Sequence, residues 1–421
     1  MAETALNPLP HRAAALEIIR VMRDAGHTAY LAGGCVRDAL LGQTPKDYDV
    51  ATDATPDRVR RLWPRSNAVG EAFGVVLCYH GHGDQRLTTE VATFRSESTY
   101  SDGRRPDAVT FTTADEDAHR RDFTINGLFA DPHLDDTTQP DAIIDFVDGQ
   151  ADLQARVIRA IGDPDQRFAE DYLRMLRAVR FAARLNFTLH PDTASAIRQH
   201  APKLDRIARE RIGDEVRRTL TGPNSELAVR LLYDLRLFEP IFGQPFVSLQ
   251  PFFQHLDTEA DYATRLALLG RGLDPCLSLD AYRNALCLTN AEDQALRQTV
   301  SQFANRDDIA ADQPIAMQKR WFAHPRADQV LRHWAALGSS READDARQRM
   351  HALASDGIGL APTPLLTGDH LVAAGLTPGP AFKPLLEAVY DAQLEGRVTT
   401  ADQALGLALQ HAPQRQPPPD P

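Results

Sequence analysis

The pattern of apolar residues changes near Leu153 and divides the chain into two parts. Before that point, short apolar runs are separated by turns rich in Gly, Pro and Asp, which is typical of β-strands. After it, apolar residues recur at helical spacing, with almost no strand signal. The pattern therefore predicts an α+β fold, in which an α/β head with a mixed sheet precedes an all-helical region.

The head is expected to begin with an amphipathic helix. Apolar positions predict this helix over about 11–25, and Gly26 closes it. Strands are predicted over 29–32, 48–51, 75–79, 87–94 and 108–112. The proline-rich end, residues 414–421, is expected to be disordered.

Length and composition are those of an ordinary globular protein. The 421 residues are 43% hydrophobic and 25% charged, which suits roughly two to four packed units. No uncharged apolar segment approaches the roughly 18–20 residues of a membrane span, and the N-terminus does not have the pattern of a secretion signal. The four cysteines are scattered, without the spacing of a disulfide framework or a zinc site. These features predict a cytoplasmic protein with free thiols.

Charge is unevenly distributed along this acidic chain. The formal net charge is −12, which taken alone argues against nucleic-acid binding. Residues 151–236, however, carry 16 Arg and Lys against 12 Asp and Glu. All but four of the 46 basic residues are arginine, whose planar guanidinium suits phosphates and base edges, although codon bias would produce the same excess. The segment 151–236 is therefore a candidate for a positive strip.

Candidate catalytic residues lie between positions 30 and 50, in the sequence YLAGGCVRDALLGQTPKDYDV. Gly33 and Gly34 join an apolar strand to a short helix, at a turn where backbone N–H groups can approach a phosphate. Asp47 and Asp49 are two residues apart, so on a strand their carboxylates share one face. Such a pair is costly unless a cation neutralises it, although a solvated turn carries the same residues.

Glu90 is a third candidate acid, because it interrupts the uncharged run 87–94. A carboxylate in a buried strand needs a partner, whereas one on an edge strand can face water. If this strand lies beside Asp47 and Asp49, three carboxylates converge. Mg²⁺ takes such oxygen ligands, and two ions can activate a 3′-hydroxyl and stabilise a pyrophosphate leaving group. The three acids therefore predict a Mg²⁺ site for nucleotidyl transfer.

The motifs GGCVRDALLG and KDYDV resemble the signature of class II CCA-adding enzymes and bacterial poly(A) polymerases. Further segments resemble the other motifs of the family in the same order: RRDFTIN at 120–126, the hinge residues Asp148-Gly149 and Asp152-Leu153, the nucleotide-selecting motif EDYLRMLRAVRFAARL at 170–185, the motif Glu210-Arg211-Ile212, and the tail segment LTGDHLVAAGLTPGP at 366–380. The resemblance implies a nucleotidyltransferase-type catalytic head over 1–145 and a helical neck with the base-selecting helix over 146–220. It also implies a helical body over 221–360 and a helical tail that binds tRNA over 361–413.

The resemblance also implies roles for individual residues. Asp47, Asp49 and Glu90 would be catalytic ligands of Mg²⁺. The triphosphate would be bound by Gly33, Gly34, Arg37 and Arg121, and the ribose by Asp122 and Asn126. The base would be read by Asp171 and Arg174, with Arg177 and Arg180 helping to hold that surface and the phosphates.

The residues of the selecting motif are predicted to form one helix. Apolar residues from Phe168 to Ala183 recur on one of its faces, and charged residues occupy the other. Asp171 and Arg174 are neighbours on such a helix, able to form an ion pair or to meet a flat polar ligand together, and a solvated face is the alternative. The resemblance implies that Asp171 accepts from the amino group of cytosine or adenine while Arg174 donates to the ring, which admits only CTP and ATP.

The product is predicted from two further segments. Poly(A) polymerases of the family typically carry a basic Gly-[Arg/Lys]-[Arg/Lys]-Phe element, whereas this chain has Gly70-Glu71-Ala72-Phe73. A CC-only enzyme would not have the complete loop Ser98–Asp107 before RRD. We expect CCA addition to the 3′ end of tRNA, recognised by its shape along the positive strip. Poly(A) synthesis and A-only addition are the alternatives.

Two functions of other classes fit parts of the sequence. A non-catalytic RNA-binding protein would use the arginines after decay of the acidic site, but Asp47 and Asp49 are both present. A small-molecule nucleotidyltransferase shares the paired carboxylates but gives no reason for the long helical region. Mg²⁺-dependent incorporation of nucleotides into RNA separates these functions from the expected one.

Overall fold

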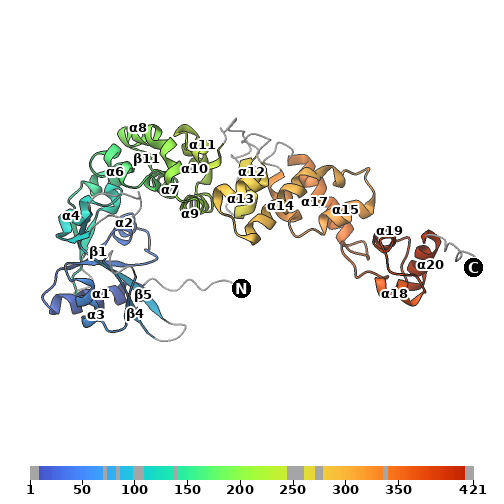
Figure 1. The fold of residues 1–421 in the computed structure, drawn as a ribbon, viewed down its shortest axis with the longest axis horizontal. Coiled ribbons are helices and arrows are strands. Elements are labelled where there is room, and N and C mark those ends of the chain that lie inside the picture. Colours follow the sequence, from blue (N-terminus) through green and yellow to red (C-terminus); the bar gives the residue numbers. More distant parts are fainter. Residues whose placement is uncertain are drawn as a thin grey trace, which may run out of the picture. The chain divides into compact units, whose positions relative to one another are not determined.

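The chain forms two compact units (Figure 1). The first unit comprises Met1–Phe246 and Asp280–Cys287, and the second comprises Val247–Leu279 and Leu288–Pro421. The finer division at residues 145, 220 and 360 stays a prediction. The computed structural model describes residues 9–69, 74–81, 86–97, 109–135, 140–243, 260–270, 278–334 and 340–412.

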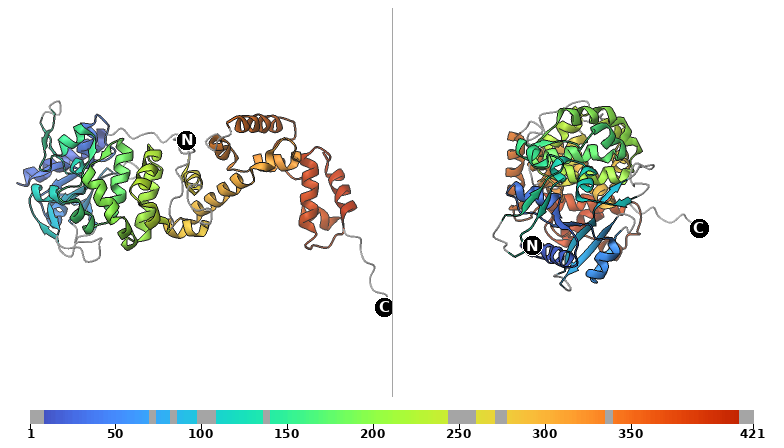
Figure 2. Two further views of the ribbon diagram at one scale, coloured as in Figure 1. Left: turned by 90° about the horizontal axis from the view of Figure 1, so that it is seen from above. Right: turned by 90° about the vertical axis from the view of Figure 1, so that its left-hand side faces the viewer.

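A mixed seven-stranded sheet, coloured blue to cyan in Figure 2, forms the core of the first unit in the described residues. The strand order is β3-β4-β5-β2-β1-β8-β9. Only β2 and β5 pair in parallel within this order, and their neighbours pair antiparallel. The strands are β1 (Ala29–Ala32), β2 (Asp49–Thr52), β3 (Ser66–Ala68), β4 (Val75–His80), β5 (Leu87–Thr93), β8 (Phe129–Asp131) and β9 (Ala142–Ile144).

The two faces of this sheet carry different cores. One face packs against α1 (Leu9–Asp24) and α3 (Pro56–Leu62) (Figure 1), and it includes Val50 and Val91. The other face includes Ala51 and packs against Ala118 of α4 (Ala114–His119). Side chains alternate along a strand, so the residues before Val50 and Val91 lie on the face that α4 covers.

Helices and two short strand pairs complete the first unit. The helices are α2 (Gly34–Leu40), η3 (Thr124–Asn126), α5 (Gly149–Ala155), α6 (Pro164–Glu170), α7 (Leu173–Leu185), α8 (Pro191–His200), η4 (Ala201–Arg206), α9 (Arg209–Leu220), α10 (Ser225–Asp234), α11 (Phe238–Phe242) and most of α13 (Leu279–Leu286). The strand pairs are β6 (Arg95–Glu97) with β7 (Val109–Phe111), and β10 (Val157–Ile158) with β11 (Thr188–Leu189).

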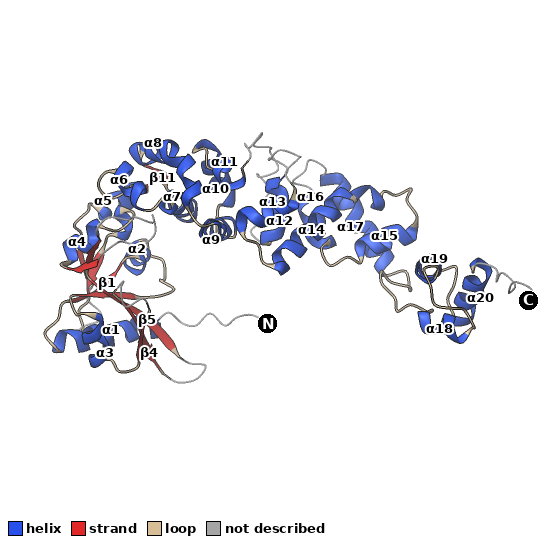
Figure 3. Ribbon diagram, in the orientation of Figure 1, coloured by secondary structure: helices blue, strands red, loops and turns tan. Residues whose placement is uncertain are grey.

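The described elements of the second unit are all helices (Figure 3). A capping box between Thr289 and Glu292 begins helix α14. The last three helices share a small core around Leu371 and Val389. The elements are α12 (Tyr262–Gly270), α14 (Asn290–Ala304), η6 (Arg306–Ile309), α15 (Ile315–Phe322), α16 (Ala327–Trp334), α17 (Ser340–Ala354), α18 (Gly368–Ala373), α19 (Phe382–Leu394) and α20 (Ala401–His411).

The α+β fold predicted from the apolar pattern is confirmed. The first helix ends before Gly26, which has φ 85°, and β1 spans the predicted residues. The pattern missed β3, β6, β8 and β9, and it missed the pair β10 and β11 in the helical region; these strands have only two or three residues each. None of the helices in the described ranges is long and apolar enough to span a bilayer. The predicted disordered end, 414–421, lies outside those ranges.

Candidate active site

A cavity of about 690 Å³ in the first unit brings together every site residue that the sequence predicted. Acidic residues from the sheet line part of it, and arginines from α2, α7 and the segment after α4 line much of the rest. The predicted residues in the lining are Gly33, Gly34, Arg37, Asp47, Asp49, Glu90, Arg121, Asp122, Asn126, Asp171, Arg174, Arg177 and Arg180.

Gly33 occupies a position that requires glycine. Its φ is 70°, in the left-handed region that side chains rarely adopt, and it caps the N-terminus of α2. A Cβ atom at this residue would lie 2.9 Å from Nη1 of Arg121. The Gly33 N–H donates to the carbonyl oxygen of Leu128 at 2.9 Å. The turn therefore keeps the backbone and the Arg121 guanidinium close together at the edge of the cavity.

Asp49 and Glu90 lie on neighbouring parallel strands. Val50 pairs with Val91 in the register of β2 and β5, so the two acids before them share the opposite face of the sheet. Asp47 also lines the cavity, but it lies in the loop before β2 rather than on the strand. Burial, followed by the charges of Asp47 and Glu90, raises the pKa of the Asp49 carboxyl to about 7. Burial and the neighbouring acids therefore both disfavour the ionised form of Asp49 when no cation is bound.

These acids suit a divalent cation that is shared with a substrate. Among the residues described, no group of three or more His, Cys, Asp or Glu side chains is arranged to hold an ion by itself. Mg²⁺ usually keeps several waters and is bound through one or two carboxylates together with substrate phosphates. Asp47 and Asp49 supply such carboxylates. Burial and then the charges of Asp47 and Glu90 raise the pKa of Asp49, and a bound cation would favour its ionised form.

Two partners fix the side chain of Arg37. This arginine is only 3% exposed. Its Nη1 donates to Oδ1 of Asn126 at 2.6 Å, and its Nε and Nη2 donate to Oδ1 of Asp38 at 2.8 and 2.6 Å. Asp38 also accepts from Nη2 of Arg184 on α7 at 3.1 Å. The predicted triphosphate-binding residue is therefore held in a network that joins α2 to α7.

Asp117 orients two consecutive arginines. Its Oδ2 accepts from Nε and Nη2 of Arg121 at 3.2 and 3.0 Å, and its Oδ1 accepts from Nε of Arg120 at 2.8 Å. Burial alone would raise the pKa of Asp117, but the charges of both arginines hold it below its usual value. Arg121 Nη1 also donates to the carbonyl oxygen of Asn126 at 3.0 Å. Both guanidinium groups line the cavity in fixed orientations.

Asp122 is a buried carboxylate that remains ionised. Its Oδ1 accepts from Nδ2 of Asn126 at 3.0 Å, and its Oδ2 accepts from Nε of Arg177 at 2.8 Å. Burial opposes ionisation, but Arg177, the Asn126 hydrogen bond and then Arg174 lower the pKa of Asp122 to about 2. This predicted ribose-binding residue therefore carries a full charge next to the arginines of α7.

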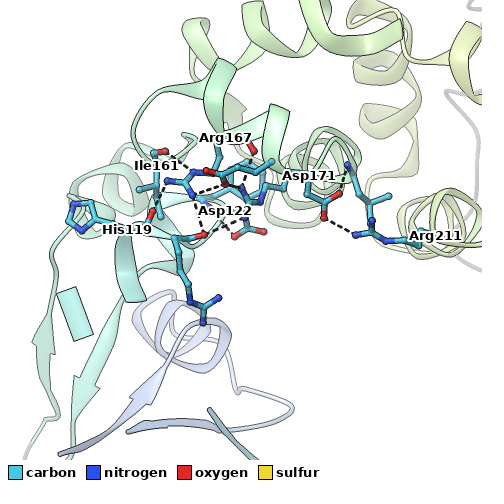
Figure 4. Close-up of polar contacts among 11 residues, drawn as sticks. His119, Asp122, Ile161, Arg167, Asp171 and Arg211 are labelled. Atoms are coloured by element: carbon cyan, nitrogen blue, oxygen red, sulfur yellow. Dashed lines mark hydrogen bonds and ion pairs between the residues drawn. The ribbon is translucent and has the colours of Figure 1, made fainter. Parts of the chain in front are cut away.

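The prediction of one continuous helix through the selecting motif is wrong. Helix α6 ends at Glu170, Asp171 is extended with φ −151° and ψ 102°, and α7 begins at Leu173. The Asp171 carboxylate favours this break, because its Oδ1 accepts from the Leu173 N–H at 3.0 Å. Its Oδ2 accepts from Nη2 of Arg211 at 2.7 Å, as Figure 4 shows.

Asp171 and Arg174 line the same cavity, although they do not lie on successive turns of one helix. Arg174 forms an ion pair with Glu170, and its Nη1 donates to the carbonyl oxygen of Arg167 at 2.9 Å. Asp171 instead forms an ion pair with Arg211. Each member of the predicted base-reading pair is thus held by a partner of opposite charge.

The ring of Phe181 lies among three guanidinium groups. Their central carbons lie 5.3 Å from the ring centroid for Arg37, 5.4 Å for Arg177 and 4.5 Å for Arg180. Such cations are attracted to the face of an aromatic ring. Arg180 also pairs with Glu215 of α9. The positive wall is therefore supported by both an aromatic ring and buried acids.

Several residues of the lining have no role predicted from the sequence. On α7, Phe181 and Arg184 follow Arg177 by four and seven residues, so helical spacing places them on the face of that arginine. Arg211 comes from α9, and its position beside Asp171 depends on packing between segments 40 residues apart. The unassigned residues are Asp38, Lys46, Arg120, Leu173, Phe181, Arg184 and Arg211.

Asp49 is expected to destabilise the metal-free protein as the pH rises. The pKa of its carboxyl is 3.8 when unperturbed and about 7 in the folded protein. Between these values the folded state holds a proton that the unfolded chain has released, so the free energy of unfolding falls as pH rises and stays low above 7. With EDTA at pH 8, Asp49→Asn should therefore raise the free energy of unfolding by roughly 1–2 kcal/mol, after allowance for solvent screening.

Urea unfolding of both proteins at pH 8 and near pH 4 measures this effect. The difference between Asp49→Asn and the unaltered protein should shrink toward pH 4, and adding Mg²⁺ at pH 8 should narrow it by stabilising the unaltered protein. An equal difference at both pH values would show that the substitution acts through packing rather than through charge.

Two family profiles match the chain. Residues 29–159 match the poly A polymerase head domain, and residues 186–249 match the probable RNA and SrmB-binding site of polymerase A. The first match contains the acids and Arg121, and the second contains Arg211. The fold and its cavity thus define a nucleotidyltransferase with a polymerase-type head and an adjoining helical region.

Comparisons with individual proteins identify the family within this class. The CCA-adding enzyme of Levilactobacillus brevis is 35% identical over 400 residues, which cover 93% of this chain and 96% of that protein. The Bacillus subtilis CCA-adding enzyme is 39% identical over 278 residues, covering 64% and 67%. A crystal structure of the Bacillus stearothermophilus CCA-adding enzyme in complex with CTP superimposes with a TM-score of 0.73 at 29% identity, covering 96% of this chain and 98% of that one.

The chain belongs to the CCA-adding enzyme family of tRNA nucleotidyltransferases. Enzymes of this family generally depend on a divalent metal ion. The two segments from which the product was predicted, Gly70–Phe73 and Ser98–Asp107, lie outside the described residues.

Proposed function

We propose that this protein completes or repairs the 3′ end of tRNA by adding CMP and AMP units from CTP and ATP, with Mg²⁺ as the metal ion and without a nucleic-acid template. The observation that carries the proposal is the composition of one cavity. The cavity is lined by acids that suit a metal ion and by arginines that suit a triphosphate. It is also lined by one acidic and one basic residue, Asp171 and Arg174, that together suit a base. The similarity to the CCA-adding enzyme of Levilactobacillus brevis and to the crystal structure of the Bacillus stearothermophilus enzyme extends over nearly the whole length of each chain.

The reaction joins the RNA to the nucleotide at one phosphorus atom. The 3′-hydroxyl oxygen attacks the α-phosphorus of CTP or ATP, the bond to the bridging oxygen of pyrophosphate breaks, and the hydroxyl proton passes to solvent. Asp47 and Asp49, with Glu90 beside them, would hold Mg²⁺. When bound, Mg²⁺ supplies activation of the hydroxyl and neutralises charge on the pyrophosphate.

Fixed positive groups provide the phosphate site. Arg37 and Arg121 have orientations set by Asp38, Asn126 and Asp117, so little rearrangement is needed when a triphosphate enters. The turn at Gly33 lets backbone approach the phosphates. Asp122 and Asn126, which hydrogen-bond to each other at 3.0 Å, are proposed to contact the ribose.

Asp171 and Arg174 are proposed to read the base. On the Watson–Crick edge, cytosine and adenine each present an amino donor beside a ring nitrogen that accepts, which matches one carboxylate and one guanidinium. Uracil and guanine present a ring N–H donor at that position instead. Arg211 and Glu170 hold the two side chains from behind. Arg177 and Arg180, supported by Phe181, would keep the surrounding wall positive.

The tRNA is proposed to follow the positive strip in residues 151–236. This strip overlaps the profile of a polymerase RNA-binding site at 186–249. Phosphate contacts along such a strip would position the acceptor arm by shape. We propose that the protein acts in the cytoplasm, where tRNA and nucleoside triphosphates are available.

Three tRNA transcripts test the proposal directly. The pure protein is incubated with CTP, ATP and Mg²⁺ and with transcripts that end before CCA, after CC and after CCA, and product masses are read. Three additions, one addition and none are expected. An extended adenosine tail on all three would identify a poly(A) polymerase, addition to the CC transcript alone would identify an A-only enzyme, and tRNA binding without incorporation would identify a binding protein.

A further inference from the structure

Arg167 binds backbone carbonyl groups from two different segments (Figure 4). Its Nη2 donates to the carbonyl oxygen of His119 at 2.6 Å, its Nη1 to that of Arg120 at 3.3 Å, and its Nε to that of Ile161 at 3.2 Å. The side chain is 14% exposed. One guanidinium on α6 therefore joins the end of α4 to the segment that leads into α6.

The carbonyls of His119 and Arg120 lie where α4 ends. The last carbonyl groups of a helix have no partner within the helix and carry partial negative charge, so a cation at this position satisfies and stabilises them. The next residues along the chain are Arg121 and Asp122, which line the cavity. Arg167 therefore fixes the starting point of the segment that carries the proposed phosphate and ribose contacts.

The same guanidinium reaches the base-reading side of the cavity. Nη1 of Arg167 donates to Oε2 of Glu170 at 3.0 Å, and that oxygen also accepts from Arg174. Nη2 of Arg174 donates to the carbonyl oxygen of Arg120 at 3.4 Å, and Nη1 donates to that of Arg167. Arg167, Glu170, Arg174 and the backbone of Arg120 thus form one closed network.

This network spans a break in the helices. Because α6 ends at Glu170 and α7 begins at Leu173, a continuous ladder of helical hydrogen bonds does not hold the corner that carries Asp171. The orientation of Arg174 relative to the segment after α4 depends instead on side-chain contacts. Arg167 is the member of the network that contacts the end of α4, Glu170 and the segment before α6 at once.

We propose that Arg167 is a positioning residue for nucleotide selectivity, which sets the place of Arg174 relative to the phosphate and ribose contacts. The inference rests on the proposed function, because it concerns which nucleotide the cavity accepts. A lysine cannot replace Arg167 here, since one ammonium group cannot present the planar set of donors that three carbonyls and a carboxylate require.

The variants Arg167→Lys and Arg167→Gln test the proposal through the ratio of kcat/KM for CTP to that for UTP on a transcript that ends before CCA. We expect this ratio to fall about tenfold in both variants, because a displaced Arg174 loses its bond to the correct base. Lys keeps the charge and most of the packing, so its selectivity is measurable even where Gln lowers stability.

Arg209→Gln is the matched control. Nη1 of Arg209 donates to the carbonyl oxygens of Pro240 and Ile241 at 3.1 and 2.8 Å, so it makes the same kind of contact, but Arg209 does not line the cavity. This variant should keep the CTP to UTP ratio within about twofold, whatever it does to the melting temperature. A ratio for Arg167→Lys and Arg167→Gln that matches the control would overturn the proposal and leave Arg167 a structural residue.

A double-mutant cycle with Arg174→Ala gives the second readout. If Arg167 acts through Arg174, adding Arg167→Lys to Arg174→Ala should change selectivity by less than about twofold, since the group to be positioned is already gone. Additive losses would contradict the proposal. The unaltered protein separates this inference from the proposed function, because failure to prefer CTP over UTP there refutes the function, whereas preserved selectivity in both Arg167 variants refutes only the inference.

Discussion

Asp49→Ala is expected to lower nucleotide incorporation by at least about 10³-fold, because the substitution removes a ligand of the metal ion on which the transfer depends. Asp49 is one of two acids that the strands β2 and β5 present on one face of the sheet. Burial and the charges of Asp47 and Glu90 disfavour its ionised form, so its removal should leave the fold intact. Asp49→Ala is therefore expected to lose activity without losing the stability of the fold.

Single-turnover incorporation of labelled CMP measures the loss in Asp49→Ala, and far-ultraviolet circular dichroism with a tRNA-binding assay checks the fold. The matched control is Asp57→Ala, whose side chain is 71% exposed on α3; this variant should retain full activity. If Asp49→Ala turns over at a rate close to that of Asp57→Ala, then Asp49 is not part of the active site.

Arg174→Ala is expected to reduce the preference for CTP and ATP over UTP and GTP by about 100-fold, while the Mg²⁺ concentration for half-maximal activity changes little. A site that hydrogen-bonds the correct base rejects others because their groups leave buried donors and acceptors unpaired. Removing the guanidinium removes that penalty. Arg174 is 11% exposed in the cavity, so its donors are little screened by water.

Competition among the four nucleotides on one transcript, at several Mg²⁺ concentrations, tests this prediction. The control Arg230→Ala removes an arginine that is 51% exposed on α10 and pairs with Glu226 four residues earlier; its selectivity should not change. If Arg174→Ala keeps its selectivity but requires far more Mg²⁺, then Arg174 serves the phosphates or the metal rather than the base.

The sequence was informative where chemistry is local. Gly33 is followed within 16 residues by Asp49, so one short stretch supplies a turn, a helix and the acids, and its residues could be recognised directly. The pairing of β2 with β5 could not be predicted from the sequence, because an isolated Glu90 is equally compatible with an edge strand that faces water. The structure places Glu90 beside the acidic loop through the parallel pairing of two strands.

The sequence was less informative where tertiary contacts override periodicity. The spacing of apolar residues around Asp171 continues through the break between α6 and α7, so it predicts one helix. The available signal was Asp171 itself, since Asp competes for backbone N–H groups and favours helix N-termini over helix interiors. The ion pair with Arg211 joins residues 40 positions apart and has no counterpart in local sequence.

A crystal structure of the protein with CTP and Mn²⁺, in which manganese is located by its anomalous scattering, tests the central claim most directly. We predict a manganese peak bonded to Asp47, Asp49 and the triphosphate, with the cytosine ring against Asp171 and Arg174. A nucleotide bound outside this cavity, or manganese that contacts none of the three acids, would contradict the assignment of the site and of the reaction.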